Sequence, residues 1–209
     1  MIDWEYKERF DYKEKLEEKT NKIYLQFLFN TIKKDDIVES ILDTRSIHKF
    51  LFRELTPPRC EYLAGNYRGD NYKHLKDMEI GVGNDRGIPP DLVKQAMNKF
   101  GLNLKKGLCE LDKLHQNPNK LEPEKSKRTV VFACEIFILF LRIHPYANGN
   151  GHIARYILIA ILKTYGYEIT HFPLDPRPNE PQYSQYIKEY IAGNKTPLVK
   201  WIFEKIKLK

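Results

Sequence analysis

The sequence has few cysteines, and none of them belongs to a metal or redox motif. Cys60, Cys109 and Cys134 are its three cysteines among 209 residues, and no two of them are spaced as C-x-x-C. A structural zinc site needs about four clustered ligands, which this spacing does not supply. A sparse, odd number of cysteines is typical of free thiols in a reducing compartment rather than of a disulfide framework. The sequence therefore predicts a cytoplasmic protein without a zinc site.

Long hydrophobic runs are also lacking. The longest, residues 130–141, is shorter than the roughly 18 residues of a membrane span and carries Glu135 in its middle. The first residues, Met1 to Glu5, hold no basic stretch followed by an apolar one, as a secretory signal would. We therefore expect no membrane partner and no secretory signal.

Positive charge is in modest excess, and it is scattered. The net charge is +7, from 35 Lys and Arg against 28 Asp and Glu. Residues 1–20 hold seven acids and five bases, whereas residues 105–128 and 195–209 carry +3 and +4. This mixture is typical of solvated helix faces, so we expect no nucleic-acid partner. Aromatics and lysines interleaved over residues 183–209 leave a basic nucleic-acid-binding protein as an alternative, but aromatics at helical spacing more often fill a core.

The spacing of apolar residues predicts a mostly α-helical fold. Spacings of three and four residues mark helices over 23–32, 37–51, 92–111, 123–143, 153–162 and 183–191, and a last helix follows Thr196. Proline in the first turn marks the starts at Pro90 and Pro123, and a bend is expected near Gly101. The second half of the helix from Pro123 and the helix over 153–162 are apolar on almost every face, which predicts that both are central and buried.

The segment from Tyr62 to Gly87 has a different composition. It contains five glycines, and Ile80 and Val82 alternate with Gly81 and Gly83, which predicts a short β-hairpin or an extended loop. Among the remaining polar residues, we expect His48, His74 and His115 at the surface or at helix ends.

A short polar loop separates the two buried helices. It reads His144-Pro145-Tyr146-Ala147-Asn148-Gly149-Asn150-Gly151. Because Pro145 disfavours helical dihedrals in the preceding residue, His144 should end the first helix and project from it. The two Asn-Gly pairs tolerate positive φ, and successive amides in such a turn at a helix N-terminus make an anion cradle.

Arg155 strengthens the prediction of an anion site. It falls in the first turn of the second helix or just past it, where the helix dipole disfavours a cation, and no acid in that turn offsets it. An anionic ligand would offset it. A phosphate cradle, an arginine and a histidine that can take a proton near pH 7 thus lie within twelve residues.

The loop resembles the signature of the Fic (filamentation induced by cAMP) family, histidine–x–Phe–x–acid–Gly–Asn–Gly–Arg–x–x–Arg. Here the signature runs from His144 to Arg155. Residues 47–52 and 64–68 are similar to the family's helix leading into its flap hairpin, and residues 88–97 to the start of its next helix. Residues 183–190 and 193–198 are similar to its closing helices. The resemblance covers roughly residues 45–203. It implies a mostly α-helical bundle with a short β-hairpin flap. It also implies one catalytic domain, residues 45–209, after an N-terminal helical extension, residues 1–44.

The resemblance implies a protein adenylyltransferase, which moves AMP from ATP to a Ser, Thr or Tyr hydroxyl of a target protein. His144 would be the catalytic base and Tyr146 the anchor of the loop. The remaining site residues implied for the nucleotide are Asn148, Gly149, Asn150, Gly151, His152 and Arg155. Those implied for the flap, where the target would bind, are Tyr67, Arg68, Ile80 and Val82.

Two positions depart from the family signature. Asn148 stands where the family more often has a metal-binding acid, so it would hold Mg²⁺ only weakly. His152 replaces the first arginine and would be mostly neutral at pH 7. We hypothesise that the two changes are coupled, since together they leave the net charge of the loop unaltered.

The departures leave other functions open. The alternatives are phosphotransfer to a target protein and a degenerate Fic module that binds nucleotide without catalysis. The Ser/Thr-x-x-x-Glu pattern of the family's self-inhibitory helix occurs only at Thr164 to Glu168, where the family does not place it. Inhibition would therefore come from a separate antitoxin-like protein, or would be absent.

Overall fold

The computed structural model describes residues 4–82, 85–178 and 181–207, and for residues 82, 85 and 86 it describes the backbone only. Three features of the sequence analysis fall outside these ranges: the first residues, Met1 to Asp3, Gly83 of the expected hairpin, and Lys209 of the basic tail. Within them, the elements in chain order are η1 (Tyr6–Glu8), α1 (Tyr12–Leu28), α2 (Lys34–Leu42), α3 (Arg45–Phe52), η2 (Arg53–Leu55), η3 (Glu61–Leu63), β1 (Gly81–Val82), β2 (Asp85–Arg86), α4 (Pro90–Gln116), α5 (Glu122–Ile143), α6 (Asn150–Thr164), β3 (Glu168–Ile169), α7 (Gln182–Ile191), α8 (Thr196–Phe203) and β4 (Ile206–Lys207).

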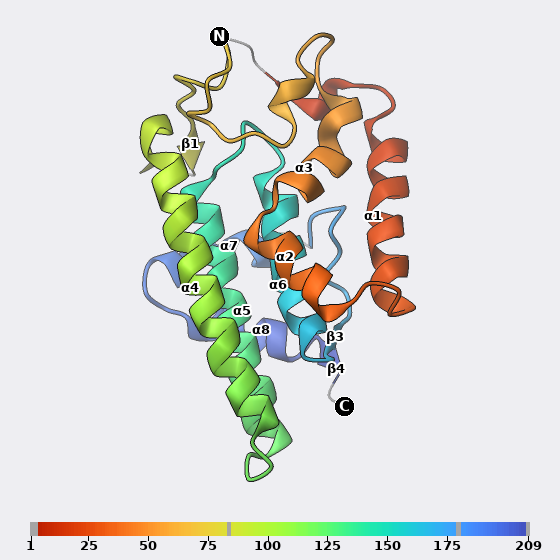
Figure 1. Cartoon of the computed structure of the whole chain (residues 1–209), viewed down its shortest axis with the longest axis vertical. Helices are drawn as coiled ribbons and strands as arrows, with labels where there is room; N and C mark the ends of the chain where they lie inside the picture. The colour runs from red at the N-terminus through yellow and green to blue at the C-terminus, as the bar shows by residue number, and fades with distance from the viewer. Residues whose placement is uncertain (1–3, 83–84, 179–180, 208–209) are drawn as a thin grey trace.

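Helix α5 is the centre of the bundle. It packs against α4, α6, α7 and α8, and the long α4 and α5 run side by side through the molecule (Figure 1). Every residue of α6 from His152 to Leu162 is buried, so the expectation of a second central helix is confirmed. Helix α4 begins at Pro90 as predicted, and it continues through Gly101 as one α-helix. A single glycine costs a helix only about 1 kcal/mol, and packing on both sides of it outweighs this cost.

The β structure is small. The predicted hairpin is present, with Gly81 opposite Arg86 and Val82 opposite Asp85. A second antiparallel pair, β3 with β4, joins Ile169 to Ile206 near the end of the chain and was not predicted. Two-residue strands are too short to show an alternation of apolar and polar residues.

The N-terminal residues belong to the same core as the rest of the chain. Trp4, Tyr6, Leu16 and Phe27 are all buried, and α1 packs against α3. Helix α2 packs against α6. The packing therefore brings residues 4–13 close to the loop between α5 and α6.

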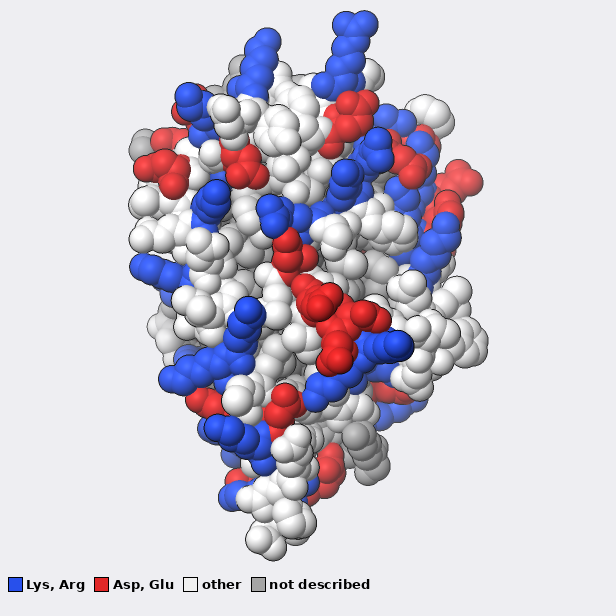
Figure 2. Space-filling model, viewed as in Figure 1, with Lys and Arg blue, Asp and Glu red and all other residues white. Residues whose placement is uncertain are grey.

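Charges of both signs are interspersed on the face seen in Figure 2, with acidic groups gathered near its middle. Helix α2 and the turn after it contribute Asp36, Glu39 and Asp43 to a surface hollow. Among the described residues, no helix combines the length and the apolar character that crossing a membrane requires.

Candidate active site

The loop between α5 and α6 begins with a residue in the left-handed conformation. His144 is the C-cap of α5, with φ 51° and ψ 60°, and its amide still donates to the Phe140 carbonyl at 2.9 Å. Pro145 thus moves His144 out of the right-handed helical region, as expected, although into the left-handed rather than the extended region. The chain turns sharply at this point, and the His144 side chain lines a cavity.

The hydrogen bonds of His144 define its tautomer. Its Nδ1 lies 3.2 Å from the Leu141 carbonyl oxygen. Because a carbonyl can only accept, Nδ1 carries the proton and Nε2 keeps a lone pair. Burial lowers the pKa of His144, and the positive charge of Arg68 lowers it further against the Leu141 hydrogen bond. The imidazole is therefore neutral at pH 7 and can accept a proton through Nε2.

Tyr146 and Asn150 close the loop on itself. The Asn150 side chain accepts from the Tyr146 amide at 2.9 Å and donates to the Tyr146 carbonyl at 2.8 Å. The Tyr146 side chain is fully buried, and its hydroxyl lies 2.7 Å from Thr44 Oγ1 at the start of α3. The Asn150 side chain is therefore used to shape the loop, and only its backbone amide remains for a ligand.

His48 was expected at the surface or at a helix end, but it lies buried in the middle of α3, so this prediction was wrong. The side chain is completely buried and stacks on Tyr146, with ring centroids 3.7 Å apart. The Gly65 amide donates to His48 Nδ1 at 2.9 Å, so Nε2 carries the proton and donates to the Asn148 carbonyl at 3.0 Å. Burial lowers the pKa of His48 to about 3. His48 is therefore a neutral histidine that supports the loop through Tyr146 and the Asn148 carbonyl.

The amides at the start of α6 form the expected anion site, with one correction. Within the two Asn-Gly pairs, Gly149 alone has positive φ, at 76°, while Asn150 and Gly151 already belong to the first turn of α6. The His152 and Ile153 amides both donate to the Gly149 carbonyl. Within the described part of the chain, the Asn150 and Gly151 amides ahead of them are the first-turn N–H groups left for a ligand.

Arg155 lies one turn further along α6. Its guanidinium is buried, and Nε and one terminal nitrogen both donate to the Leu174 carbonyl. The other terminal nitrogen lies 3.5 Å from the Tyr183 hydroxyl, a poor hydrogen bond, and it would lie 3.3 Å from a Cβ placed on Gly151. One edge of the guanidinium is thus fixed by the protein, and the other remains for an anion at the start of α6.

His152 pairs with a residue that the sequence analysis missed. Its Nε2 lies 2.9 Å from Asp175 Oδ1, in the segment before α7. Burial lowers the pKa of His152 to about 4, in spite of the hydrogen bond to Asp175. Burial alone would raise the pKa of Asp175, but the His152 hydrogen bond and the charges of Arg155 and Lys7 lower it overall. At pH 7 the pair is therefore a neutral imidazole donating to a carboxylate.

Asn148 does not fit the metal role expected of it. Its side-chain oxygen accepts from the Gly149 amide at 2.7 Å, and its side-chain nitrogen donates to the Trp4 carbonyl at 2.8 Å. Magnesium is usually held by one or two carboxylates together with substrate phosphates. In the described ranges, no three His, Cys, Asp or Glu side chains cluster as metal ligands would. The residues present therefore fit a magnesium site poorly, and Asn148 instead ties the loop to the N-terminal residues.

Two of the expected target-binding residues are buried. Tyr67 packs against Tyr146 and is 9% exposed, and Arg68 is 1% exposed, so their side chains offer little surface to a target protein. Arg68 donates to the carbonyls of His144 and Ile143 at the end of α5, and to those of Met78 and Ile88 on either side of the hairpin. It therefore fastens the flap to the loop. Ile80 lines the cavity, and Val82 lies in β1.

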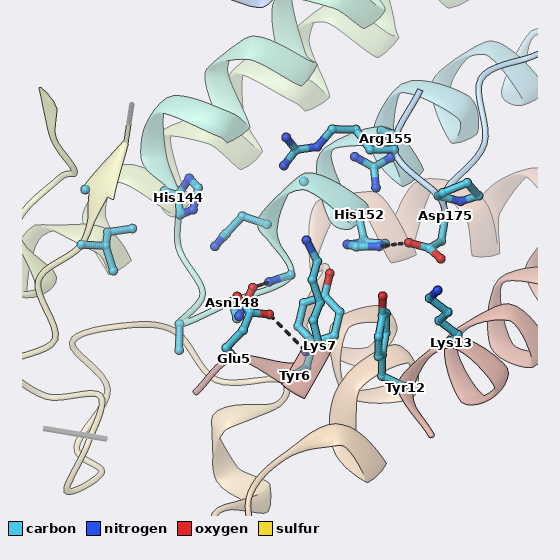
Figure 3. A pocket seen from close by; sticks show the side chains of 18 residues that line it. Glu5, Tyr6, Lys7, Tyr12, Lys13, His144, Asn148, His152, Arg155 and Asp175 are labelled. Atoms are coloured by element: carbon cyan, nitrogen blue, oxygen red, sulfur yellow. Dashed lines mark hydrogen bonds and ion pairs between the residues drawn. The ribbon is translucent and has the colours of Figure 1, made fainter. Parts of the chain in front are cut away.

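These residues surround one cavity of about 840 Å³. Its walls come from the loop and α6 (His144, Asn148, Gly149, Asn150, Gly151, His152, Arg155), the flap (Ile80, Gly81), the segment before α7 (Asp175, Pro176, Arg177) and the N-terminal segment, residues 4–13 (Glu5, Tyr6, Lys7, Tyr12, Lys13). Figure 3 shows His144 on one side of the cavity and the His152–Asp175 pair on the other, with the N-terminal side chains below. The contribution of the N-terminal segment was missed, because no motif or spacing connects residues 5–13 with residues 144–155.

Comparison with solved structures identifies proteins of similar fold. One solved structure of similar fold is that of the BepC protein, a VirB-translocated effector from Bartonella tribocorum, with bound AMPPNP. The TM-score is 0.55 and the sequence identity 15%, and the match covers 90% of this chain and 88% of that one. The fold is also similar to the N-terminal Fic domain of a cell filamentation protein, a VirB-translocated Bep effector from Bartonella quintana, at a TM-score of 0.57 and 15% identity over 95% and 84% of the two chains.

Of the two sequence comparisons, one found a match. No curated protein matches the chain significantly. The Fic/DOC family matches residues 40–162, which span α3, the flap, α4, α5, the loop and most of α6. Since this match takes in more than half of the chain and includes His144, Gly149 and Arg155 at the cavity, the chain belongs to the Fic/DOC family.

Proposed function

We propose that this protein transfers AMP from ATP to a hydroxyl group of a target protein. The observation that carries the proposal is that a histidine with a free Nε2 lone pair and the unsatisfied amides of a helix N-terminus face one cavity. A volume of about 840 Å³ is ample for a nucleotide. Members of the Fic family commonly transfer AMP to proteins, and the similar BepC protein binds AMPPNP, an analogue of ATP.

His144 is the general base in this proposal. Its Nε2 takes the proton of a Ser, Thr or Tyr hydroxyl, and the hydroxyl oxygen attacks the α-phosphorus of ATP. A new P–O bond forms, the bond between the α-phosphorus and the bridging oxygen breaks, and pyrophosphate leaves with the electron pair. Because burial keeps the pKa of His144 low, the base is in its active form at pH 7.

The start of α6 holds the phosphates. The Asn150 and Gly151 amides point to the site where negative charge develops, and the free edge of Arg155 lies beside Gly151. Preorganised donors of this kind stabilise a transition state because they need no rearrangement during the reaction. Magnesium would neutralise phosphate charge if it were bound, but Asn148 is engaged elsewhere, and no step here depends on the metal.

The flap presents the target. The short β1–β2 hairpin borders the cavity through Ile80 and Gly81, next to His144. An extended target segment pairing with the main chain of this hairpin would bring its hydroxyl toward the base. Target recognition is thus placed on the backbone of β1 and the Ile80 side chain rather than on Tyr67 or Arg68.

The replacement of the first arginine of the signature favours a second candidate. His152 is neutral and tied to Asp175, so the cavity holds less positive charge than the family signature provides. A module that binds nucleotide without transferring AMP, or that moves the γ-phosphoryl group instead, would tolerate this loss. Regulation by a separate antitoxin-like protein is a further proposal, since Glu168 of the Thr164–Glu168 pattern lies in β3, beyond the C-terminal end of α6, where it pairs with Lys163.

The decisive experiment follows the label of ATP. The protein and its His144→Ala variant are incubated with a cell extract and with ATP labelled on the α- or the γ-phosphate. We expect α-label on a target protein, reduced at least 100-fold in the variant. Transfer of γ-label would establish phosphotransfer instead, and nucleotide binding without transfer of either label would establish the binding module.

A further inference from the structure

The N-terminal segment carries two lysines that line the nucleotide cavity. Lys7 follows the first residue of η1 and Lys13 lies in the first turn of α1, and both are exposed. In Figure 3 the Lys7 side chain rises from the N-terminal turn toward the space between Asn148 and His152, and Lys13 lies near Asp175. In the ranges the structure describes, neither ammonium group is assigned an ion pair or a side-chain hydrogen bond, although several other lysines of the chain are paired.

The segment is held in place by buried contacts. Trp4 Nε1 donates to the Leu55 carbonyl at 3.0 Å, and the Trp4 carbonyl accepts from Asn148 at 2.8 Å. The Tyr6 ring packs against Phe52 and His152, with centroids 5.2 and 5.9 Å away. The backbone that carries Lys7 is therefore fixed to the loop and to α6, and its position beside the cavity is built into the fold.

The charged side chains that line the cavity suggest a role for the two lysines. The lining cations are Lys7, Lys13, Arg155 and Arg177, and the lining anions are Glu5 and Asp175. His152 adds no charge at pH 7, and two of the Arg155 nitrogens already donate hydrogen bonds to the Leu174 carbonyl. Lys7 lines the same cavity as His152 and Asp175, and its positive charge contributes to lowering the pKa of both.

We propose that Lys7 and Lys13 bind the phosphates that are not transferred, and so complete the nucleotide site from outside the matched family region. The site would then select a nucleoside triphosphate over a nucleoside monophosphate, because these two cations contact the β- and γ-phosphates only. Two flexible ammonium groups replace one guanidinium, which keeps the positive charge but gives up its planar, bidentate geometry. This inference rests on the proposed function, since it takes ATP as the ligand.

Calorimetric titration of the full chain with AMPPNP and with AMP tests the inference. The titrations are done in EDTA, so that Mg²⁺ does not mask the phosphate charge. Lys7→Met and Lys13→Met are compared with Lys99→Met, an exposed position on α4 that makes the same change in net charge away from the cavity. We expect each cavity variant to weaken AMPPNP binding about tenfold and to leave AMP binding within about twofold, whereas Lys99→Met changes neither.

The outcomes separate this inference from the proposed function. If the cavity variants weaken AMPPNP and AMP equally, or bind AMPPNP as well as Lys99→Met does, the lysines do not contact the outer phosphates and the inference is wrong. If the wild-type protein binds neither nucleotide, the inference and the proposed function fall together. If AMPPNP binding responds as expected but no α-label reaches a target, the lysines keep their role and only the transfer reaction is refuted.

Discussion

At the scale of single residues, Gly149 shows how closely the loop is fitted to the helices beneath it. Its φ of 76° is a conformation that residues with a side chain rarely adopt, and a Cβ there would lie 2.4 Å from the Phe52 ring. Phe52 itself is fully buried between Trp4, Tyr6, His48 and His152. The ring therefore has no room to yield.

Gly149→Ala should destabilise the protein by about 2–4 kcal/mol, from the strained backbone and the overpacked ring together. Gly101→Ala is the matched control, because Gly101 lies inside α4 and a Cβ there meets nothing within 4 Å. The control should gain about 0.5–1 kcal/mol. Urea unfolding of both variants is the measurement, and equal stabilities would contradict the prediction.

Sequence distance separates the site residues that could be predicted from those that were missed. His144, Gly149 and Arg155 could be predicted because the motif is local. Asp175 could not, because its contact with His152 spans 23 residues and no local pattern reveals it. His48 left a signal that was not used: Thr44, His48, Leu51 and Leu55 are spaced by three and four residues, and all four are buried.

At the scale of elements, Arg68 joins parts of the chain that are distant in sequence. Its guanidinium is enclosed by four carbonyl groups, two at the end of α5 and two flanking the hairpin. Burial lowers the pKa of Arg68 to about 10, and the group remains charged at pH 7. Unpaired carbonyls at a helix C-terminus carry partial negative charge, which a cation stabilises.

Arg68→Lys should cost about 2–4 kcal/mol, because one ammonium group cannot reach all four carbonyls and leaves buried acceptors unpaired. Arg53→Lys, at an exposed position in η2, should change the stability by less than about 0.5 kcal/mol. Thermal and urea unfolding compare the two. Equal stability of the two variants would mean that the Arg68 hydrogen bonds contribute nothing beyond its charge.

The long elements could be predicted from the sequence, and their junctions could not. Helices α4, α5 and α6 show the apolar residues expected of them, and α4 and α5 have the expected proline in their first turn. The role of Arg68 depends on a contact across 75 residues to Ile143. The family resemblance gave Arg68 a role in binding the target, and nothing in the sequence pattern shows that the end of α5 covers its side chain.

At the scale of the whole molecule, the site is built on buried neutral histidines. Burial lowers the pKa of His48 to about 3 and that of His152 to about 4. The charge of His152 lowers the pKa of His48 further, and the charges of Arg155 and Lys7 lower that of His152. In the unfolded chain both would titrate near 6.5. Between these values the unfolded state binds more protons than the folded state. The contribution of the two neutral histidines to the free energy of unfolding is therefore fully present above pH 6.5 and falls as the pH is lowered.

We expect a loss of roughly 4 kcal/mol between pH 7 and pH 5, since each histidine contributes about 1.4 kcal/mol per pH unit below 6.5. In His152→Gln, which can still donate to Asp175, the loss attributable to these two histidines should fall to about half. Urea unfolding at several pH values measures both slopes. A free energy of unfolding that is constant from pH 7 to pH 5 would contradict the prediction.

The position of Trp4 has a practical consequence. Its indole is 6% exposed and meets the rings of His48 and Phe52 edge-on, while its carbonyl holds Asn148. The chain has one other tryptophan, Trp201 on α8. In a Trp201→Phe background, the intrinsic fluorescence would come from a single indole that touches the residues supporting the catalytic loop. The protein thus carries its own optical reporter of the contact between the N-terminal segment and the loop that follows α5.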